Sequence, residues 1–86
     1  MIQVVCAVKD RAADAFGRPF FAQTQGVAIR SFMDEVSRAA EDNQLYQHPD
    51  DFDLFELGTY DDSIGMITML PEPKLLMLGK QVRNGS

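Results

Sequence analysis

The sequence predicts an α+β fold, in which a small, largely antiparallel sheet carries one main amphipathic helix packed on one face. Three observations predict it: apolar residues alternate over 2–8, a helical stripe of apolar residues runs through 26–42, and two strand-like segments flank a turn within 53–70. The chain has 86 residues, 45% of them hydrophobic, which is enough for one hydrophobic core. We therefore expect a single domain over residues 1–86, with 83–86 as a disordered tail.

The first segment, 2–8, is expected to be the central strand. Its two faces are both apolar, with Ile2, Val4, Cys6 and Val8 on one and Val5 and Ala7 on the other. A strand that is apolar on both faces is normally covered on both. One helix can cover only one face, so we expect a second copy to cover the other, in a homodimer or a higher homo-oligomer.

The helix over 26–42 is predicted by apolar residues at the spacing of one helical face, namely Ile29, Phe32, Met33, Val36 and Ala40. Thr24 is the expected N-cap, because its hydroxyl can accept a hydrogen bond from the first turn. Asn43 is the expected residue at the C-terminal end.

The segment 53–70 predicts an antiparallel hairpin with a bulge at Gly58 and a turn around Gly65. The sequence Pro71-Glu72-Pro73 is expected to stop strand pairing, and 74–78 is expected to be a short last strand. We expect an irregular segment over 9–25 and a polar connection over 44–53.

The sequence contains no recognisable catalytic constellation. The only histidine, His48, lies in a polar loop, and the only cysteine, Cys6, lies in the apolar first strand, where a small buried hydrophobe is expected. Three aspartates resemble a metal loop but lack the glycine and the distal glutamate of a calcium site: Asp50, Asp51 and Asp53. We therefore expect a non-enzymatic protein with no catalytic residue, no metal and no cofactor.

The charges are unevenly distributed along the chain, whose net charge is −5. Residues 34–62 hold ten acids against one base, whereas residues 1–33 hold four bases against two acids. The overall sign opposes unspecific attraction to phosphates, but separate acidic and basic faces remain compatible with it. The single cysteine and the short apolar start predict a cytoplasmic protein that does not enter a membrane.

Aromatic and basic residues are interleaved between positions 9 and 30. Single-stranded nucleic acid is held by rings that stack on bases and by cations that meet phosphates. The candidate nucleic-acid-binding residues are therefore Lys9, Arg11, Arg18, Phe20, Phe21 and Arg30, with Phe16 beside them. The alternative interpretation is that the phenylalanines belong to the core and the cations are scattered over the surface.

A resemblance to a known family runs from Val8 to about Ile67. Its strongest pieces are Pro19-Phe20-Phe21, then Ala28-Ile29-Arg30-Ser31-Phe32, then His48-Pro49 followed by Leu54-Phe55-Glu56-Leu57-Gly58. In these motifs the chain resembles the small nonstructural protein of gokushoviruses, the single-stranded DNA phages of the Microviridae.

The resemblance implies a non-enzymatic single-stranded DNA-binding protein that acts in viral DNA replication or single-strand synthesis. It also implies the host cytoplasm as the location and a phage or host replication protein as a further partner. The competing hypothesis is a protein-interaction or assembly factor that uses its acidic face, which the net charge of −5 favours.

Overall fold

The computed structural model describes residues 1–84, and the side chains of residues 1–82. In this part of the chain, five strands form one sheet: β1 (Ile2–Asp10), β2 (Ala15–Phe16), β3 (Phe20–Ala22), β4 (Phe52–Asp61) and β5 (Met66–Leu78). The helices are α1 (Gln25–Ser37), α2 (Gln44–Gln47), the 3-10 turn η1 (Pro49–Asp51) and α3 (Gly79–Asn84). The predicted tail over 83–86 lies outside the residues with described side chains, and residues 85–86 lie outside the described chain altogether.

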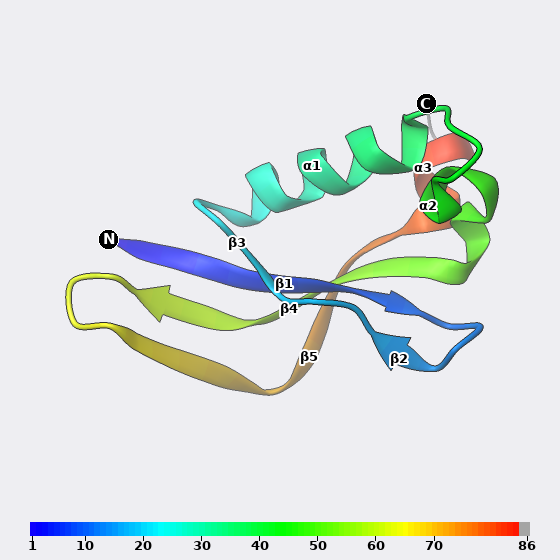
Figure 1. Ribbon diagram of the computed structural model, residues 1–86. Coiled ribbons are helices and arrows are strands. Elements are labelled where there is room, and N and C mark those ends of the chain that lie inside the picture. The colour runs from blue at the N-terminus through cyan, green and yellow to red at the C-terminus, as the bar shows by residue number, and fades with distance from the viewer. Residues whose placement is uncertain (85–86) are drawn as a thin grey trace.

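The sheet is antiparallel throughout and has the strand order β2-β1-β4-β5. The short strand β3 also pairs with β1, along a different part of its length from β2. The long strand β1 is therefore central, as its two apolar faces predicted. Figure 1 shows α1, α2 and α3 on the same side of this sheet, so the predicted α+β fold is confirmed.

The hydrophobic core lies between α1 and the sheet. Buried side chains from α1, from the sheet and from α3 meet there: Ala28, Phe32, Val36, Cys6, Ala22, Leu54 and Val82. The predicted helix stripe therefore faces the sheet, with Ile29 and Met33 packed against the edge of the core. Burial of this stripe, rather than intrinsic helix propensity, is what stabilises a helix of this length.

Helix α1 begins one residue before the predicted start, at the predicted N-cap, and ends earlier than predicted. Thr24 is its N-cap, since its hydroxyl oxygen accepts a hydrogen bond from the backbone N–H of Val27 at 3.1 Å. The helix stops at Ser37, five residues before the predicted end at 42. The cause is Asn43, whose side-chain amide donates to the carbonyl oxygens of Glu35 and Arg38, both at 2.8 Å, in place of the next helical N–H groups.

The prediction of an irregular segment over 9–25 is wrong in part. Residues Ala15–Phe16 and Phe20–Ala22 add to β1 as β2 and β3, on either side of the Gly17–Pro19 link. The polar connection over 44–53 likewise contains α2 and η1, and Asn43 caps α2 by accepting from the N–H of Leu45 at 3.1 Å.

The predicted hairpin is formed by β4 and β5, which are joined by a turn in which Gly65 has a φ of 67°. The pairing is interrupted where prolines were expected to stop it: Gly58 pairs with Met69 and Glu56 with Lys74, so the stretch that contains Pro71 and Pro73 bulges out. Strand β5 nevertheless resumes pairing and continues to Leu78, so 74–78 is its second half.

Within residues 1–84, no helix has the length and apolar character needed to cross a membrane.

Candidate nucleic-acid interface

The face of the sheet turned away from α1 is here called the open face. In Figure 1 no helix lies on that side of the sheet. Strand alternation and register assign these residues to it: Gln3, Val5, Ala7 and Lys9 of β1, Phe16, Phe21, Phe55 and Tyr60 of β2 to β4, and Ile67, Met69 and Leu75 of β5.

Four aromatic rings form two pairs on the open face. The centroids of Phe16 and Phe55 are 5.4 Å apart at an interplanar angle of 70°, and those of Phe21 and Tyr60 are 5.2 Å apart at 73°. Edge-to-face packing of this kind holds each ring in a fixed orientation. Phe16 and Phe21 remain 41% and 49% exposed, so each pair presents a ring to solvent.

The second pair depends on a bulge in β4. Strict alternation would place Phe55 and Tyr60 on opposite faces, because they are an odd number of residues apart. On β1, however, Val5 pairs with Gly58 and Cys6 with Glu56, so Leu57 is the extra residue and the alternation changes phase. The sequence predicts this bulge at Gly58, next to the residue that is bulged. The resulting change of phase, which brings Phe55 and Tyr60 to the same face, was not predicted.

The open face carries one well-placed cation, Lys9. Its ammonium lies 5.5 Å from the centroid of the Phe16 ring and 3.4 Å from a carboxylate oxygen of the exposed Asp14. A cation at this distance from a ring face is attracted to its quadrupole. Ring and cation are thus presented together on one surface.

Arg11 follows directly after β1 and is bound by an acid of the open face. Its Nε lies 3.0 Å from an oxygen of Asp53, which is buried and also accepts the backbone N–H of Gly79 at 3.3 Å. This carboxylate is the acid that the register places on the open face, and Arg11 neutralises it. The Arg11 side chain stays about half exposed.

The other three predicted residues do not join Lys9 and Phe21 on one surface. Arg18 is exposed in the link between β2 and β3, at the edge of the sheet. Phe20 faces the helix side and packs against the core. Arg30 lies on α1 opposite Ala28 and Phe32, and so points away from the sheet.

The acids of the segment 34–62 lie mainly away from the open face. Asp34 is on the exposed side of α1, Glu56 faces α1 and accepts from the side chain of Gln25 at 2.5 Å, and Asp50 is in η1. Glu35 is paired with Arg38 at 2.7 Å, and this hydrogen bond holds the pKa of the Glu35 carboxyl below its usual value. The basic and aromatic side of the sheet is therefore separated from most of the negative charge.

Residues 3–82 match the family model of the Phage ORF5 protein. The chain belongs to the Phage ORF5 protein family. It is a bacteriophage protein, as the resemblance of its motifs implied. No curated protein and no solved structure matches the chain.

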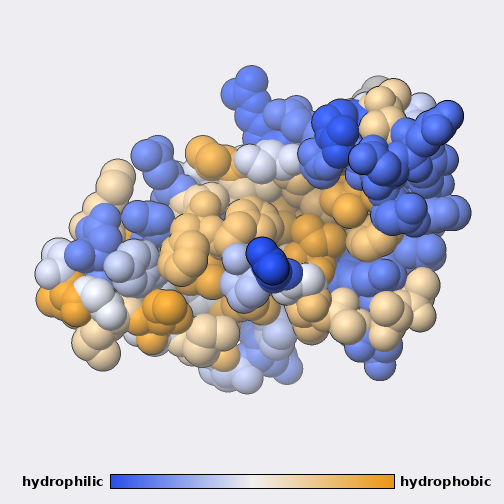
Figure 2. Space-filling view, viewed as in Figure 1, coloured by the Kyte–Doolittle hydropathy of each residue, from blue (hydrophilic) through white to orange (hydrophobic). Residues whose placement is uncertain are grey.

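An apolar hollow of about 210 Å³ opens in this Phage ORF5 family member between α1 and the β3 edge of the sheet. Figure 2 shows the hydrophobic side chains gathered across the middle of this view, with hydrophilic ones over α2 and the C-terminal part of α1. The apolar hollow is lined by Val8, Phe20, Ser31, Phe32, Glu35 and Leu45. The ring of Phe20 lies in this wall, which explains why it is not presented on the open face.

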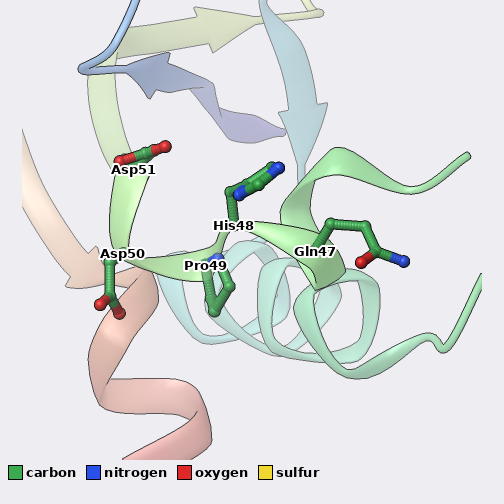
Figure 3. A pocket seen from close by; sticks show the side chains of 5 residues that line it. All are labelled: Gln47, His48, Pro49, Asp50 and Asp51. Atoms are coloured by element: carbon green, nitrogen blue, oxygen red, sulfur yellow. The ribbon is translucent and has the colours of Figure 1, made fainter. Parts of the chain in front are cut away.

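A polar hollow of about 220 Å³ lies at α2 and η1, lined by Gln47, His48, Pro49, Asp50 and Asp51. In Figure 3 the carboxylates of Asp50 and Asp51 project to opposite sides of the chain, so they do not converge on one point. No three acidic, histidine or cysteine side chains among the described residues come together as metal ligands. The hollow also has no serine or cysteine beside His48 to serve as a nucleophile.

The single thiol of this phage protein is a core group. Cys6 is fully buried on β1, and burial raises the pKa of its thiol to about 11, with a smaller contribution from Glu56. The thiol is therefore neutral at physiological pH and shielded from reagents, as expected for a small hydrophobe.

Proposed function

We propose that this Phage ORF5 family member is a non-enzymatic single-stranded DNA-binding protein of a small gokushovirus-like phage. It acts in the host cytoplasm, in viral DNA replication or single-strand synthesis. The observation that carries the proposal is the open face, where two edge-to-face ring pairs present Phe16 and Phe21 to solvent and the ammonium of Lys9 lies beside the Phe16 ring.

The chemistry of this surface suits unpaired bases. Each base of a single strand has a free π-face, and stacking on an aromatic side chain contributes about 1–3 kcal/mol per base without regard to sequence. The two exposed rings lie on β2 and β3, which pair with different stretches of the same edge of β1, so bases of one strand can meet both. Binding of this kind has little sequence preference.

The small number of cations near the open face limits the strength of DNA binding. Lys9 is on the open face, Arg11 adjoins it while paired with Asp53, and Arg18 is at the sheet edge. With so few phosphate contacts, the salt dependence is shallow, with a slope of about −0.7 per contact for a single strand. The net charge of −5 weakens the encounter further at low salt.

The test is a titration of a fluorescently labelled oligothymidine by anisotropy, at low and at moderate salt. Phe21→Leu keeps an apolar side chain of similar size but removes the ring, so binding weakens by a factor of roughly 5–150, the equivalent of one lost stacking interaction. Because no phosphate contact is lost, the salt slope is unchanged.

The matched control is Val27→Ala. Val27 is 46% exposed, close to the exposure of Phe21, but lies on α1 away from the open face. This variant binds as the parent does. Equal affinity of Phe21→Leu and the parent would remove the stacking site, and no binding at low salt would reject the DNA proposal. The second outcome would favour the interaction or assembly factor that uses the acidic residues of α1 and η1.

A further inference from the structure

The outer edge of β5 forms one border of the sheet. Strand β5 pairs with β4 on one side, and the strand order ends there, so its other edge has no partner strand among the described residues. The segment Met66–Leu70 lies along this edge, and Met66, Ile67 and Met69 are each more than half exposed. The β4–β5 hairpin also extends past the N-terminal end of α1, so no helix covers this part (Figure 1).

The Met66–Leu70 part of this edge lacks the features that normally prevent strands from pairing across molecules. Such edges usually carry lysines, prolines or inward-pointing charges. Met66–Leu70 contains none of these and reads Met-Ile-Thr-Met-Leu. The backbone limits the length of the segment that can pair. On one side Gly65 lies in the turn with a positive φ, and on the other Pro71 has no N–H to donate.

We propose that a second copy of this chain pairs with this edge, antiparallel, about a two-fold axis at Thr68. Thr68 is the midpoint of the segment that can pair, so the same strand serves both protomers, as a two-fold interface requires. Ile67 then lies opposite Met69 of the partner subunit, and Met66 opposite Leu70 of the partner subunit. These apolar cross-strand pairs stabilise the contact and fix its register.

The charges beyond the paired segment agree with this register. Lys74 and Asp62 are each six residues from Thr68, so Lys74 comes to the end that carries Asp62 of the partner subunit. Asp62 also binds the N-terminal ammonium at 2.8 Å, and Lys74 is exposed in β5 with no ion pair among the described residues. The paired segment Met66–Leu70 itself contains no charged residue, so like charges are not opposed within it.

The dimer has a consequence for the open face. An axis perpendicular to the sheet keeps the same face of both protomers on one side, so the two open faces become one continuous surface. If the proposed function holds, a long single strand can engage both ring sets at once, and the second engagement is intramolecular. The pairing itself does not rest on the proposed function.

Cysteine cross-linking tests the register. Directly opposed residues of antiparallel strands have Cα atoms about 4.5–5.5 Å apart, within the range of a disulfide. Thr68→Cys therefore forms a covalent dimer when treated with diamide, whereas Ser63→Cys, exposed in the turn and opposite Pro73 of the partner subunit, does not. The native Cys6 is buried and does not interfere.

Light scattering across a concentration series tests the assembly. The parent shows a concentration-dependent dimer, Thr68→Lys shifts it to the monomer because two like charges meet at the axis, and Thr68→Val keeps the dimer. Circular dichroism confirms that each variant is folded. A parent that stays monomeric to millimolar concentration, or a dimer that Thr68→Cys does not cross-link, overturns the proposal.

Titration with short and long oligothymidine separates this inference from the proposed function. Thr68→Lys adds a positive charge, so weaker binding cannot come from repulsion of phosphates. The variant binds a short strand as the parent does and a long strand more weakly. A cross-linked dimer that binds neither strand would leave the pairing standing and reject the DNA function alone.

Discussion

Gly58 determines how closely β4 and β5 approach. A Cβ atom at this position would overlap the backbone carbonyl oxygen of Thr68 and would lie 2.9 Å from the Cα of Met69. Neither neighbour is a flexible side-chain end, so the two strands would have to separate. This close contact lies beside the bulge at Leu57 that places Tyr60 on the open face.

We expect Gly58→Ala to lower the free energy of unfolding by about 1–3 kcal/mol or more, because the added methyl group overpacks the strand pair. Chemical denaturation measures this change. Gly26→Ala is the matched control: its nearest neighbour is the Thr24 hydroxyl at 3.7 Å, so it fits, and in the first turn of α1 it raises stability by up to about 1 kcal/mol. Equal stability of Gly58→Ala and the parent would contradict the described pairing.

For single residues, the sequence predicted the structure correctly wherever the interaction is local. The N-cap at Thr24, the buried thiol of Cys6 and the bulge beside Gly58 each follow from a residue and its immediate neighbours. The orientations of Phe20 and Phe21 could not be predicted in this way, because the register of β3 against β1 decides which ring faces the core. Of the six predicted site residues, the structure therefore places Lys9 and Phe21 together and turns Phe20 and Arg30 elsewhere.

The length of α1 is decided by Asn43. Its buried side chain donates to two helix carbonyls and accepts from the start of α2, so one amide ends one helix and begins the next. The apolar spacing that includes Ala40 is compatible with a longer helix, which is why the sequence predicted one. Capping by a residue in the following turn overrides such a pattern.

Asn43→Asp is expected to lower the free energy of unfolding by about 1–3 kcal/mol. The carboxylate can still cap α2, but it has no proton to give to the carbonyl oxygens of Glu35 and Arg38. Thermal or chemical unfolding measures the loss. Asp42→Asn changes the neighbouring exposed position and stays within about 0.5 kcal/mol of the parent. A variant at 43 as stable as this control would show that the amide does not end the helix.

The strands β2 and β3 could not be predicted as elements. They contain two and three residues, and their strand geometry depends on hydrogen bonding to β1 rather than on their own sequence pattern. Pro19 and Gly17 correctly indicated a break between them. By contrast β1, α1 and the β4–β5 hairpin each carry enough apolar periodicity to be recognised alone.

The whole molecule has two chemically different sides. Most acids of the segment 34–62 lie on α1, in the link from α1 to α2, in η1 or on the helix-facing side of β4. The open face carries exposed rings, Lys9 and the neutralised Asp53. The uneven charge along the sequence is compatible with separate acidic and basic faces. Which side the aromatic residues would take could not be predicted, since it depends on the sheet register and on the bulge in β4.

This polarity predicts different effects of two similar substitutions on DNA binding. Lys9→Gln on the open face weakens binding of oligothymidine and reduces the salt slope by about 0.7, the contribution of one phosphate contact. Arg30→Gln removes a charge from the far side of α1 and changes neither quantity, because salt screens charges over about 10 Å. Titrations over a series of salt concentrations give both slopes. An Arg30 variant with the larger effect would place the DNA on the helical side.

The two edges of the sheet differ in how well they can pair with a strand of another molecule. This difference limits how many copies can join into one continuous sheet. Stacking of strands from molecule to molecule continues into a fibre only when each copy offers a pairing edge on both sides. At the edge opposite β5, residues 1–84 offer only the two residues of β2 and the three of β3, split by a link that contains Pro19. Such short, broken strands are poor templates for a further chain. Strand pairing through β5 is therefore self-terminating, and the protein can expose an apolar edge without polymerising.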